Sequence, residues 1–183
     1  SGWADCGVQA RSDLLDKIGN ELLRQKDSIG MLLSREEGKT LPEGIGEVTR
    51  AAHIFKFFAG EVLRQTGDLL PSVRGGIDVE IVRDPMGVVG IISPWNFPAA
   101  IPAWKIAPAL AYGNAVVFKP ADLVPGTAHA IAKIIVDAGI PSGVFNFVMG
   151  RGSVVGDEIV TNPKVDAITF TGSVTTALKF VDK

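Results

Sequence analysis

Apolar residues recur at a helical period along the first third of the chain, and the period then changes. Between Val8 and Glu37, leucines and isoleucines alternate with charged residues at helical spacing, which predicts an amphipathic helix broken near Gly30. A second helix is predicted from about Glu43 to Gln65. Two short extended runs, 69–73 and 79–82, then flank Arg74-Gly75-Gly76-Ile77, and this pattern predicts a β-hairpin.

After Gly87, short apolar runs alternate with longer helical patterns. We predict strands at 87–92, 115–118, 144–148 and 166–170, and helices at about 99–112, 124–138 and 152–160, with another helix from near Ser173. Strands that alternate with helices indicate parallel βαβ units with helices on both faces. The expected fold is therefore an α/β, doubly wound, mostly parallel Rossmann-like sheet, preceded by two helices and a projecting β-hairpin.

Composition and charge narrow the function classes. The chain has 183 residues, is 46% hydrophobic and carries a net charge of −2, so nothing in its charge favours nucleic acid or a membrane as a partner. The longest apolar stretch, 99–118, is interrupted by Pro102, Lys105 and Pro108 and cannot span a bilayer. A single cysteine, Cys6, cannot form an internal disulfide, which favours a cytoplasmic location. The two isolated histidines predict no metal site.

Asn96 is the first candidate catalytic residue. The buried run 87–92 ends at Ser93-Pro94-Trp95-Asn96, where open α/β folds place ligands at the carboxyl edge of the sheet. There the side-chain amide of Asn96 can stabilise negative charge that grows on a carbonyl oxygen under attack. The alternative is that Asn96 caps the helix that follows, because asparagine is a favoured N-cap residue.

Lys119-Pro120-Ala121-Asp122 follows the next strand and is a candidate ribose site. A lysine and a carboxylate at the end of a strand can both hydrogen-bond ribose hydroxyls, and a carboxylate repels a 2′-phosphate. NAD is therefore favoured as the cofactor, with NADP as the other candidate. In the alternative interpretation, the tetrapeptide is a surface lysine followed by a turn-forming aspartate.

Two further segments can approach a diphosphate. Gly152 and Gly156 lie in a GxGxxxG run before a helix, where glycines admit a phosphate to the backbone, although the spacing departs from the GxGxxG fingerprint. Phe170-Thr171-Gly172-Ser173 ends the last predicted strand, where Gly172 permits close approach and Ser173 can cap the next helix.

In this order and spacing, these segments closely resemble the aldehyde dehydrogenase superfamily, and specifically its N-terminal, cofactor-binding half. The resemblance implies that Asn96 is the oxyanion donor, that Lys105 joins a proton relay, and that Phe97 and Trp104 line the aldehyde pocket. Lys105 could equally be a helix residue that extends its ammonium into solvent. The implied cofactor contacts are Ile92, Ser93, Pro94, Trp95, Lys119, Pro120, Ala121, Asp122, Gly152, Gly156, Phe170, Thr171, Gly172, Ser173 and Thr176. Ala177 replaces a glycine that many members carry.

The resemblance also implies a domain organisation. Residues 1–68 would be the leading helices of the cofactor-binding domain, 69–85 an oligomerisation hairpin, and 86–183 the βα units that bind NAD(P). Two apolar strands alone cannot bury themselves, and in the family that the sequence resembles a projecting segment here pairs with another subunit. The resemblance therefore implies a homodimer or homotetramer; the alternative is a hairpin folded on its own core. Both ends of the sequence look cut, and the catalytic domain is absent.

The implied activity is oxidation of an aldehyde, in the manner of members that act on small semialdehydes such as α-ketoglutarate semialdehyde. NAD(P) would accept the electrons and a cysteine would form the thiohemiacetal and thioester. The family carries that cysteine and its glutamate base beyond the Phe-Thr-Gly-Ser strand, in segments that this sequence lacks. Cys6 has no base near it, so the 183-residue chain is expected to be an inactive fragment. The alternatives are release of the thioester to coenzyme A or phosphate, and a non-catalytic cofactor-binding or assembly module.

Overall fold

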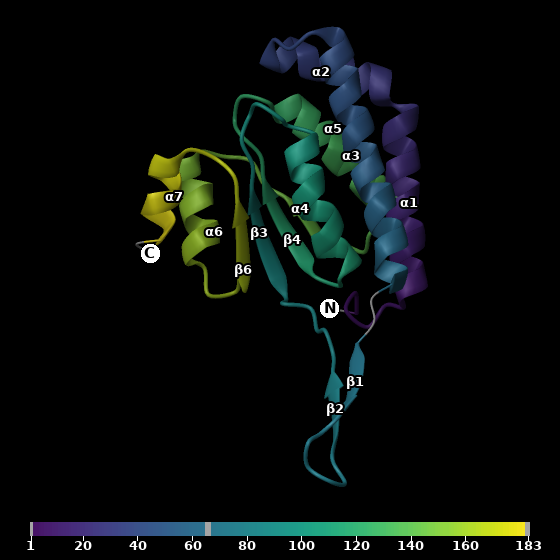
Figure 1. The fold of residues 1–183 in the computed structure, drawn as a ribbon. Helices are drawn as coiled ribbons and strands as arrows, with labels where there is room; N and C mark the ends of the chain where they lie inside the picture. The colour runs from purple at the N-terminus through teal and green to yellow at the C-terminus, as the bar shows by residue number, and fades with distance from the viewer. Residues whose placement is uncertain (1, 65–66, 182–183) are drawn as a thin grey trace.

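The computed structural model describes residues 2–64 and 67–181 (Figure 1). Three leading helices pack beside a four-stranded sheet, and a two-stranded hairpin projects from the body. The predicted α/β fold is confirmed. In the described ranges, no helix is both long and apolar enough to cross a membrane.

The predicted first helix is two helices, α1 (Val8–Arg24) and α2 (Lys26–Glu37), separated at Gln25. The predicted break near Gly30 was wrong. Gly30 lies inside α2, at the point where α3 (Leu41–Glu61) crosses it. A Cβ at Gly30 would lie 2.7 Å from the backbone nitrogen of Ile45. This glycine allows the close approach of two helices and does not end one.

Helix α3 begins two residues earlier than predicted. Thr40 precedes it, and its backbone N–H donates to the Glu43 carboxylate at 3.1 Å, which forms a capping box. A 3-10 turn, η1 (Val62–Arg64), follows the helix. The predicted end at Gln65 lies outside the described residues.

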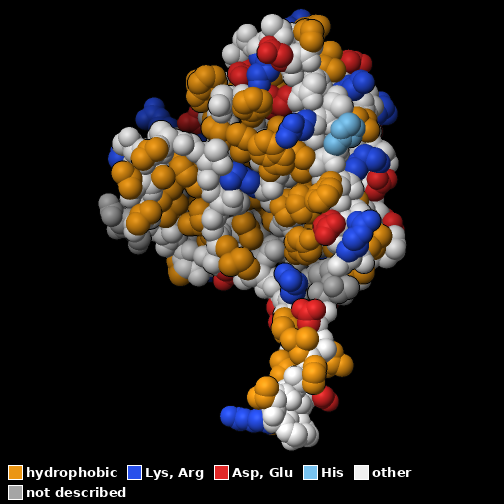
Figure 2. Space-filling view, in the orientation of Figure 1, with side chains coloured by type: hydrophobic (Ala, Val, Ile, Leu, Met, Phe, Trp, Pro, Cys, Tyr) orange, Lys and Arg blue, Asp and Glu red, His pale blue; other side chains and the backbone are white. Residues whose placement is uncertain are grey.

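The predicted hairpin is present. Strand β1 (Asp68–Pro71) pairs antiparallel with β2 (Asp78–Ile81), and every residue of both strands is exposed. Figure 1 shows the hairpin extending away from the rest of the molecule, and Figure 2 shows hydrophobic side chains along it.

The central sheet is parallel, with strand order β5-β4-β3-β6. Its strands are β3 (Val88–Ile92), β4 (Ala115–Lys119), β5 (Phe145–Phe147) and β6 (Ala167–Phe170). Helices α4 (Ala100–Ala111) and α5 (Pro125–Asp137) cover one face, on which α4 packs against β3 and β4. The short α6 (Asp157–Thr161) covers the other face, and α7 (Val174–Val181) lies beside it (Figure 1).

One predicted helix differs in form. The stretch 152–160 is a π-helical turn, η2 (Gly152–Gly156), followed by α6. Two glycines within five residues disfavour a regular α-helix, because glycine loses the most backbone freedom on ordering. The turn leaves an open glycine backbone beside the sheet at the position expected for a diphosphate.

Candidate functional site

The segments that carry Asn96 and Asp122 leave the sheet at the same edge. Ile92, the last residue of β3, is in register with Lys119, the last residue of β4. The backbone N–H of Ser93 then donates to the carbonyl of Lys119 at 3.3 Å, which holds the two strand ends together. Parallel strands that end level bring their following loops to one edge, as an open α/β ligand site requires.

The Asn96 side chain is not a helix cap. Helix α4 begins at Ala100, its N-cap residue is Ala99, and no side chain of that residue bonds to the helix. The alternative interpretation is therefore wrong. Asn96 is exposed, and within the described part of the chain its side-chain amide makes no hydrogen bond, whereas its backbone carbonyl accepts one from Lys39 Nζ at 3.1 Å.

Three aromatic side chains flank this loop or lie on α4. Trp95, Phe97 and Trp104 are about half exposed, at 50%, 46% and 46% of their surface. The ring of Phe97 lies 4.0 Å from Lys39 Nζ, and Arg50 stacks over the ring of Trp104 at 5.2 Å. Large apolar surfaces that stay accessible beside a polar amide form the kind of mixed lining that small-molecule sites use.

Lys105 points toward the sheet. Its Nζ lies 2.7 Å from the hydroxyl of Thr169 on β6, and the side chain is only partly exposed. The alternative, a lysine extended into solvent, does not describe this geometry. Burial lowers the pKa of Lys105, and an amine with a lowered pKa is better suited to proton transfer near neutral pH. Thr169 was not singled out from the sequence, where only its place in a strand was visible.

Lys119 and Asp122 form a clasp at the end of β4. Lys119 is 4% exposed, and its Nζ donates to the Pro120 carbonyl at 2.8 Å and to Asp122 Oδ1 at 3.0 Å. The alternative of a surface lysine is wrong, although Asp122 itself is exposed. Because an ammonium group has three protons, one donor of Lys119 remains for a ligand.

A cavity of about 550 Å³ lies beside this clasp. Five predicted cofactor contacts line it, namely Ile92, Lys119, Gly152, Gly156 and Thr176. Four other lining residues were not singled out from the sequence: Ser153, Asp157, Lys179 and Phe180. The remaining predicted contacts do not line it: Ser93, Pro94, Trp95, Pro120, Ala121, Asp122, Phe170, Thr171, Gly172 and Ser173. Ala177 is also outside the lining.

The chemistry of this cavity fits a dinucleotide. A Cβ at Gly152 would meet nothing within 4 Å, and one at Gly156 would approach only Ile92 at 3.9 Å, so backbone and ligand can come close there. Lys119, which keeps one donor beside Asp122, and Lys179 can both donate to a diphosphate, although Asp122 and Asp157 offset their charge. Ser93 Oγ, at the edge of the same sheet, is buried and has no hydrogen-bond partner among the described residues.

The segment Phe170–Ser173 precedes α7, whose residues line the cavity. Ser173 Oγ accepts from the backbone N–H of Thr176 at 3.3 Å, so the predicted cap of α7 is confirmed. A Cβ at Gly172 would lie 2.4 Å from the ring of Phe170, which in turn packs edge-on against Phe180 at 5.1 Å. This segment therefore orients α7, which presents Thr176, Lys179 and Phe180 to the cavity.

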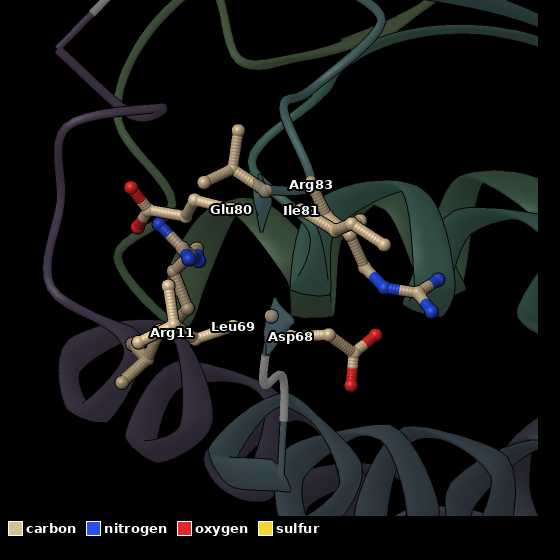
Figure 3. A pocket seen from close by; sticks show the side chains of 9 residues that line it. Arg11, Asp68, Leu69, Glu80, Ile81 and Arg83 are labelled. Atoms are coloured by element: carbon tan, nitrogen blue, oxygen red, sulfur yellow. The ribbon is translucent and has the colours of Figure 1, made fainter. Parts of the chain in front are cut away.

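A second cavity, of about 470 Å³, lies at the base of the hairpin and contains no predicted site residue. The charged residues Arg11, Asp68, Glu80 and Arg83 line it (Figure 3). Arg11 already makes hydrogen bonds within the protein. Its Nε donates to the carbonyl of Ala111 at 2.8 Å, and its Nη1 donates to carbonyls near the N-terminus. We interpret this arginine as a structural tie between α1 and the end of α4.

Comparison with known proteins agrees with this geometry. Residues 1–182 match the aldehyde dehydrogenase family. The chain is 45% identical to alpha-ketoglutaric semialdehyde dehydrogenase of Bacillus subtilis (strain 168), over 94% of this chain and 36% of that relative. It is 39% identical to succinate-semialdehyde dehydrogenase [NADP(+)] GabD of Escherichia coli (strain K12), over 93% of this chain and 36% of that relative.

Its fold also matches a solved structure with a bound cofactor. Betaine aldehyde dehydrogenase (betB) from Staphylococcus aureus in complex with NAD+ superposes with a TM-score of 0.96 and 31% identity, over 98% of this chain and 36% of that one. The chain thus spans 36% of the length of each of these three proteins. It belongs to the aldehyde dehydrogenase family.

Proposed function

We propose that the protein to which this segment belongs oxidises an aldehyde to its carboxylic acid with NAD(P), and that this segment supplies the cofactor site and the oxyanion donor. The observation that carries the proposal is the side-chain amide of Asn96, which is exposed and unbonded at the edge of the sheet. The cavity beside Lys119 lies at the same edge and fits a dinucleotide. Membership of the family supports both assignments.

The residues of this segment would act by position and charge. A cysteine from outside the segment attacks the aldehyde, and Asn96 donates its amide N–H to the oxygen on which negative charge develops. Bound NAD(P) supplies the hydride acceptor. Lys119 and Asp122 would hold the ribose, and Lys105, with its lowered pKa, would accept or donate a proton near the reacting group.

Replacement of Asn96 tests the proposal directly. In the complete enzyme, Asn96→Ala should lower kcat roughly 100- to 1,000-fold, because one preorganised oxyanion donor is removed. Cofactor affinity, measured by fluorescence titration with NAD, should not change. Asn20→Ala is a matched control, since Asn20 lies on the outer surface of α1. Unchanged turnover in Asn96→Ala would refute the role assigned to this residue.

The cofactor site can be tested on the 183-residue chain. Lys119→Met should weaken binding of NAD, whereas Asp122→Ala should narrow the preference for NAD over NADP, because it removes the carboxylate that repels a 2′-phosphate. The isolated chain mixed with NAD and a panel of aldehydes should produce no reduced nicotinamide, since it contains no nucleophile near the site. Turnover by this chain would contradict that expectation, and no binding of NAD would contradict the cofactor site.

The substrate we propose is a small semialdehyde, because the chain is 45% identical in sequence to alpha-ketoglutaric semialdehyde dehydrogenase. Release of the thioester to coenzyme A, and a purely cofactor-binding role, remain the other candidates. Steady-state assays of the complete enzyme, with and without coenzyme A, separate them. We propose a cytoplasmic location, because the single cysteine of this segment, Cys6, forms no disulfide within it.

We also propose that the hairpin pairs with a second subunit in a homodimer or homotetramer. Its exposed apolar side chains are Leu69, Leu70, Val73, Ile77, Val79, Ile81 and Val82. All eight strand residues are exposed, which argues against the alternative of a hairpin folded on its own core. Light scattering of the complete enzyme should show a smaller assembly for Leu69→Asp/Val79→Asp, and the wild-type mass in that variant would contradict the proposal.

A further inference from the structure

A lysine on the connection between α2 and α3 contacts the loop that carries Asn96. Lys39 Nζ lies 2.7 Å from Glu47 Oε2 and 3.1 Å from Glu37 Oε2. The same nitrogen donates to the backbone carbonyl of Asn96 at 3.1 Å and lies 4.0 Å from the centre of the Phe97 ring. One ammonium group, on a side chain that is 13% exposed, therefore contacts the start of the loop.

Glu47, in α3, fixes the other end of the same loop. Its second oxygen, Oε1, accepts hydrogen bonds from the backbone N–H of Ala99 at 2.8 Å and of Ala100 at 3.1 Å. These are the first free donors of α4, which has no side-chain cap of its own and no acidic residue in its first turn. A carboxylate there satisfies the donors and interacts favourably with the helix dipole.

The side chains of Lys39 and Glu47 are both largely shielded from water. The side chain of Lys39 is 13% exposed and that of Glu47 is 3% exposed. Burial by itself would lower the pKa of Lys39, but hydrogen bonds and charges from Glu47 and Glu37 outweigh it and raise this pKa above its ordinary value. Lys39 is therefore charged at neutral pH, and loss of Lys39 leaves the buried Glu47 carboxylate without its cation.

We propose that Lys39 and Glu47 are positioning residues for Asn96, which hold both ends of the 96–100 loop so that its amide faces the reacting carbonyl. The inference rests on the proposed function, because it concerns how Asn96 reaches its place. It extends the site to two residues that touch neither substrate nor cofactor. Their effect on turnover passes through the backbone of one short loop.

A double-mutant experiment in the complete enzyme separates positioning from general stability. Lys39→Met should lower kcat roughly 10- to 100-fold, as expected for a catalytic group displaced by about 1 Å, with the Kd for NAD unchanged. Lys39→Met combined with Asn96→Ala should be no slower than Asn96→Ala alone, since residues that act as a unit are not additive. Lys39→Arg, which keeps the charge, should restore most of the activity.

Lys56→Met is the matched control. Lys56, in α3, also pairs with a carboxylate, Asp16 Oδ1 at 2.6 Å, but in the described part of the chain no hydrogen bond or ion pair joins it to the 96–100 loop. Its replacement should leave kcat unchanged. Glu47→Gln is the second variant: it keeps an acceptor for Ala99 and Ala100 but loses the charge that pairs with Lys39, so it should show part of the Lys39→Met defect.

Amide hydrogen exchange on the 183-residue chain provides a readout independent of activity. Lys39→Met should accelerate exchange at Ala99 and Ala100, whereas Lys56→Met should not. Three outcomes would overturn the inference: unchanged exchange, full activity in Lys39→Met while Asn96→Ala is slow, or the same fold-loss from Lys39→Met with and without Asn96. The first two leave the proposed function standing, whereas full activity in Asn96→Ala removes both proposals.

Discussion

One face of the central sheet presents Val89, Ile91, Val116 and Phe118, all buried in a continuous core with α4 and α5. On the opposite face the alternate positions carry Gly90 and Lys119 but also Ile92 and Ile168, and this face meets the short α6. Two cavities, of about 550 and 300 Å³, lie on that second face. In α7, which also lies on that side, no described residue is buried.

The difference shows how one sheet serves two purposes. Large side chains on the first face fill space and stabilise the fold, because burial of apolar surface is the main favourable term in folding. The second face meets the short helix α6, and a cavity remains beside its strand ends, where the proposed cofactor would lie. Gly90 allows α6 to pack closely against this face, because a Cβ there would lie 2.4 Å from Ile159 of α6.

Truncation of a core aromatic should give the largest effect. Phe118 is fully buried and packs against the rings of Phe145 and Phe147. Phe118→Ala should lower the free energy of unfolding by about 3–5 kcal/mol, from lost burial and the cavity left behind. Ile168→Ala, at a residue of the other face that is 41% exposed, should cost less than about 1 kcal/mol. Equal losses in urea unfolding would contradict the distinction between the faces.

An added methyl group tests the close approach of α6. Gly90→Ala should lower the free energy of unfolding by about 1–3 kcal/mol, because its Cβ would overlap Ile159 and crowd Val165. Gly46→Ala is the control with the opposite sign: Gly46 lies on the exposed side of α3, its Cβ would meet nothing within 4 Å, and alanine favours a helix by about 0.5–1 kcal/mol. Chemical denaturation measures both, and tolerance of Gly90→Ala would show that α6 can move aside.

Removal of a helix cap should lower the global stability at α5, which covers the first face of the sheet, but not at α7, which lies on the side of the second face. Glu36 accepts from the backbone N–H groups of Gly126 and Thr127, both at 2.7 Å, at the start of α5. Glu36→Ala should cost about 0.5–2 kcal/mol of global stability, because α5 packs into the core. Ser173→Ala should instead accelerate amide exchange within α7 and leave the unfolding midpoint unchanged. A shift of the global midpoint in Ser173→Ala would mean that α7 is coupled to the core.

The smallest effect should come from a surface ion pair outside both faces. The hydrogen bond from Lys56 is the main cause that lowers the pKa of Asp16, although burial opposes it. A carboxyl group with a lowered folded pKa contributes stability above its unfolded pKa, about 3.9, and loses that contribution as pH falls through the folded value. Asp16→Asn should therefore cost about 0.2–1 kcal/mol at neutral pH and nothing at strongly acid pH. A difference that persists in acid would contradict this origin.

Local patterns were enough for most of the elements and for part of the site. Periodicity placed the leading helices, the hairpin and the four strands, because each buried face leaves a repeat in the sequence. Lys119 and Asp122 were predicted as a candidate ribose site because polar residues at the end of a strand are visible in the local sequence. Gly30 misled the prediction, since a glycine that admits a neighbouring helix looks in sequence like one that ends its own helix.

The sequence by itself determined the fold class, the shared edge of β3 and β4, and the identity of Asn96 as the amide at that edge. Only the tertiary structure decided which residues contact the loop of Asn96, because Lys39, on the connection between α2 and α3, and Glu47, in α3, are more than fifty residues away from it in the chain. Thr169, Lys179 and Phe180 likewise join the site through packing between separate elements. Contacts between distant segments follow no sequence period, and so the surroundings of the candidate site became visible only once the chain was folded.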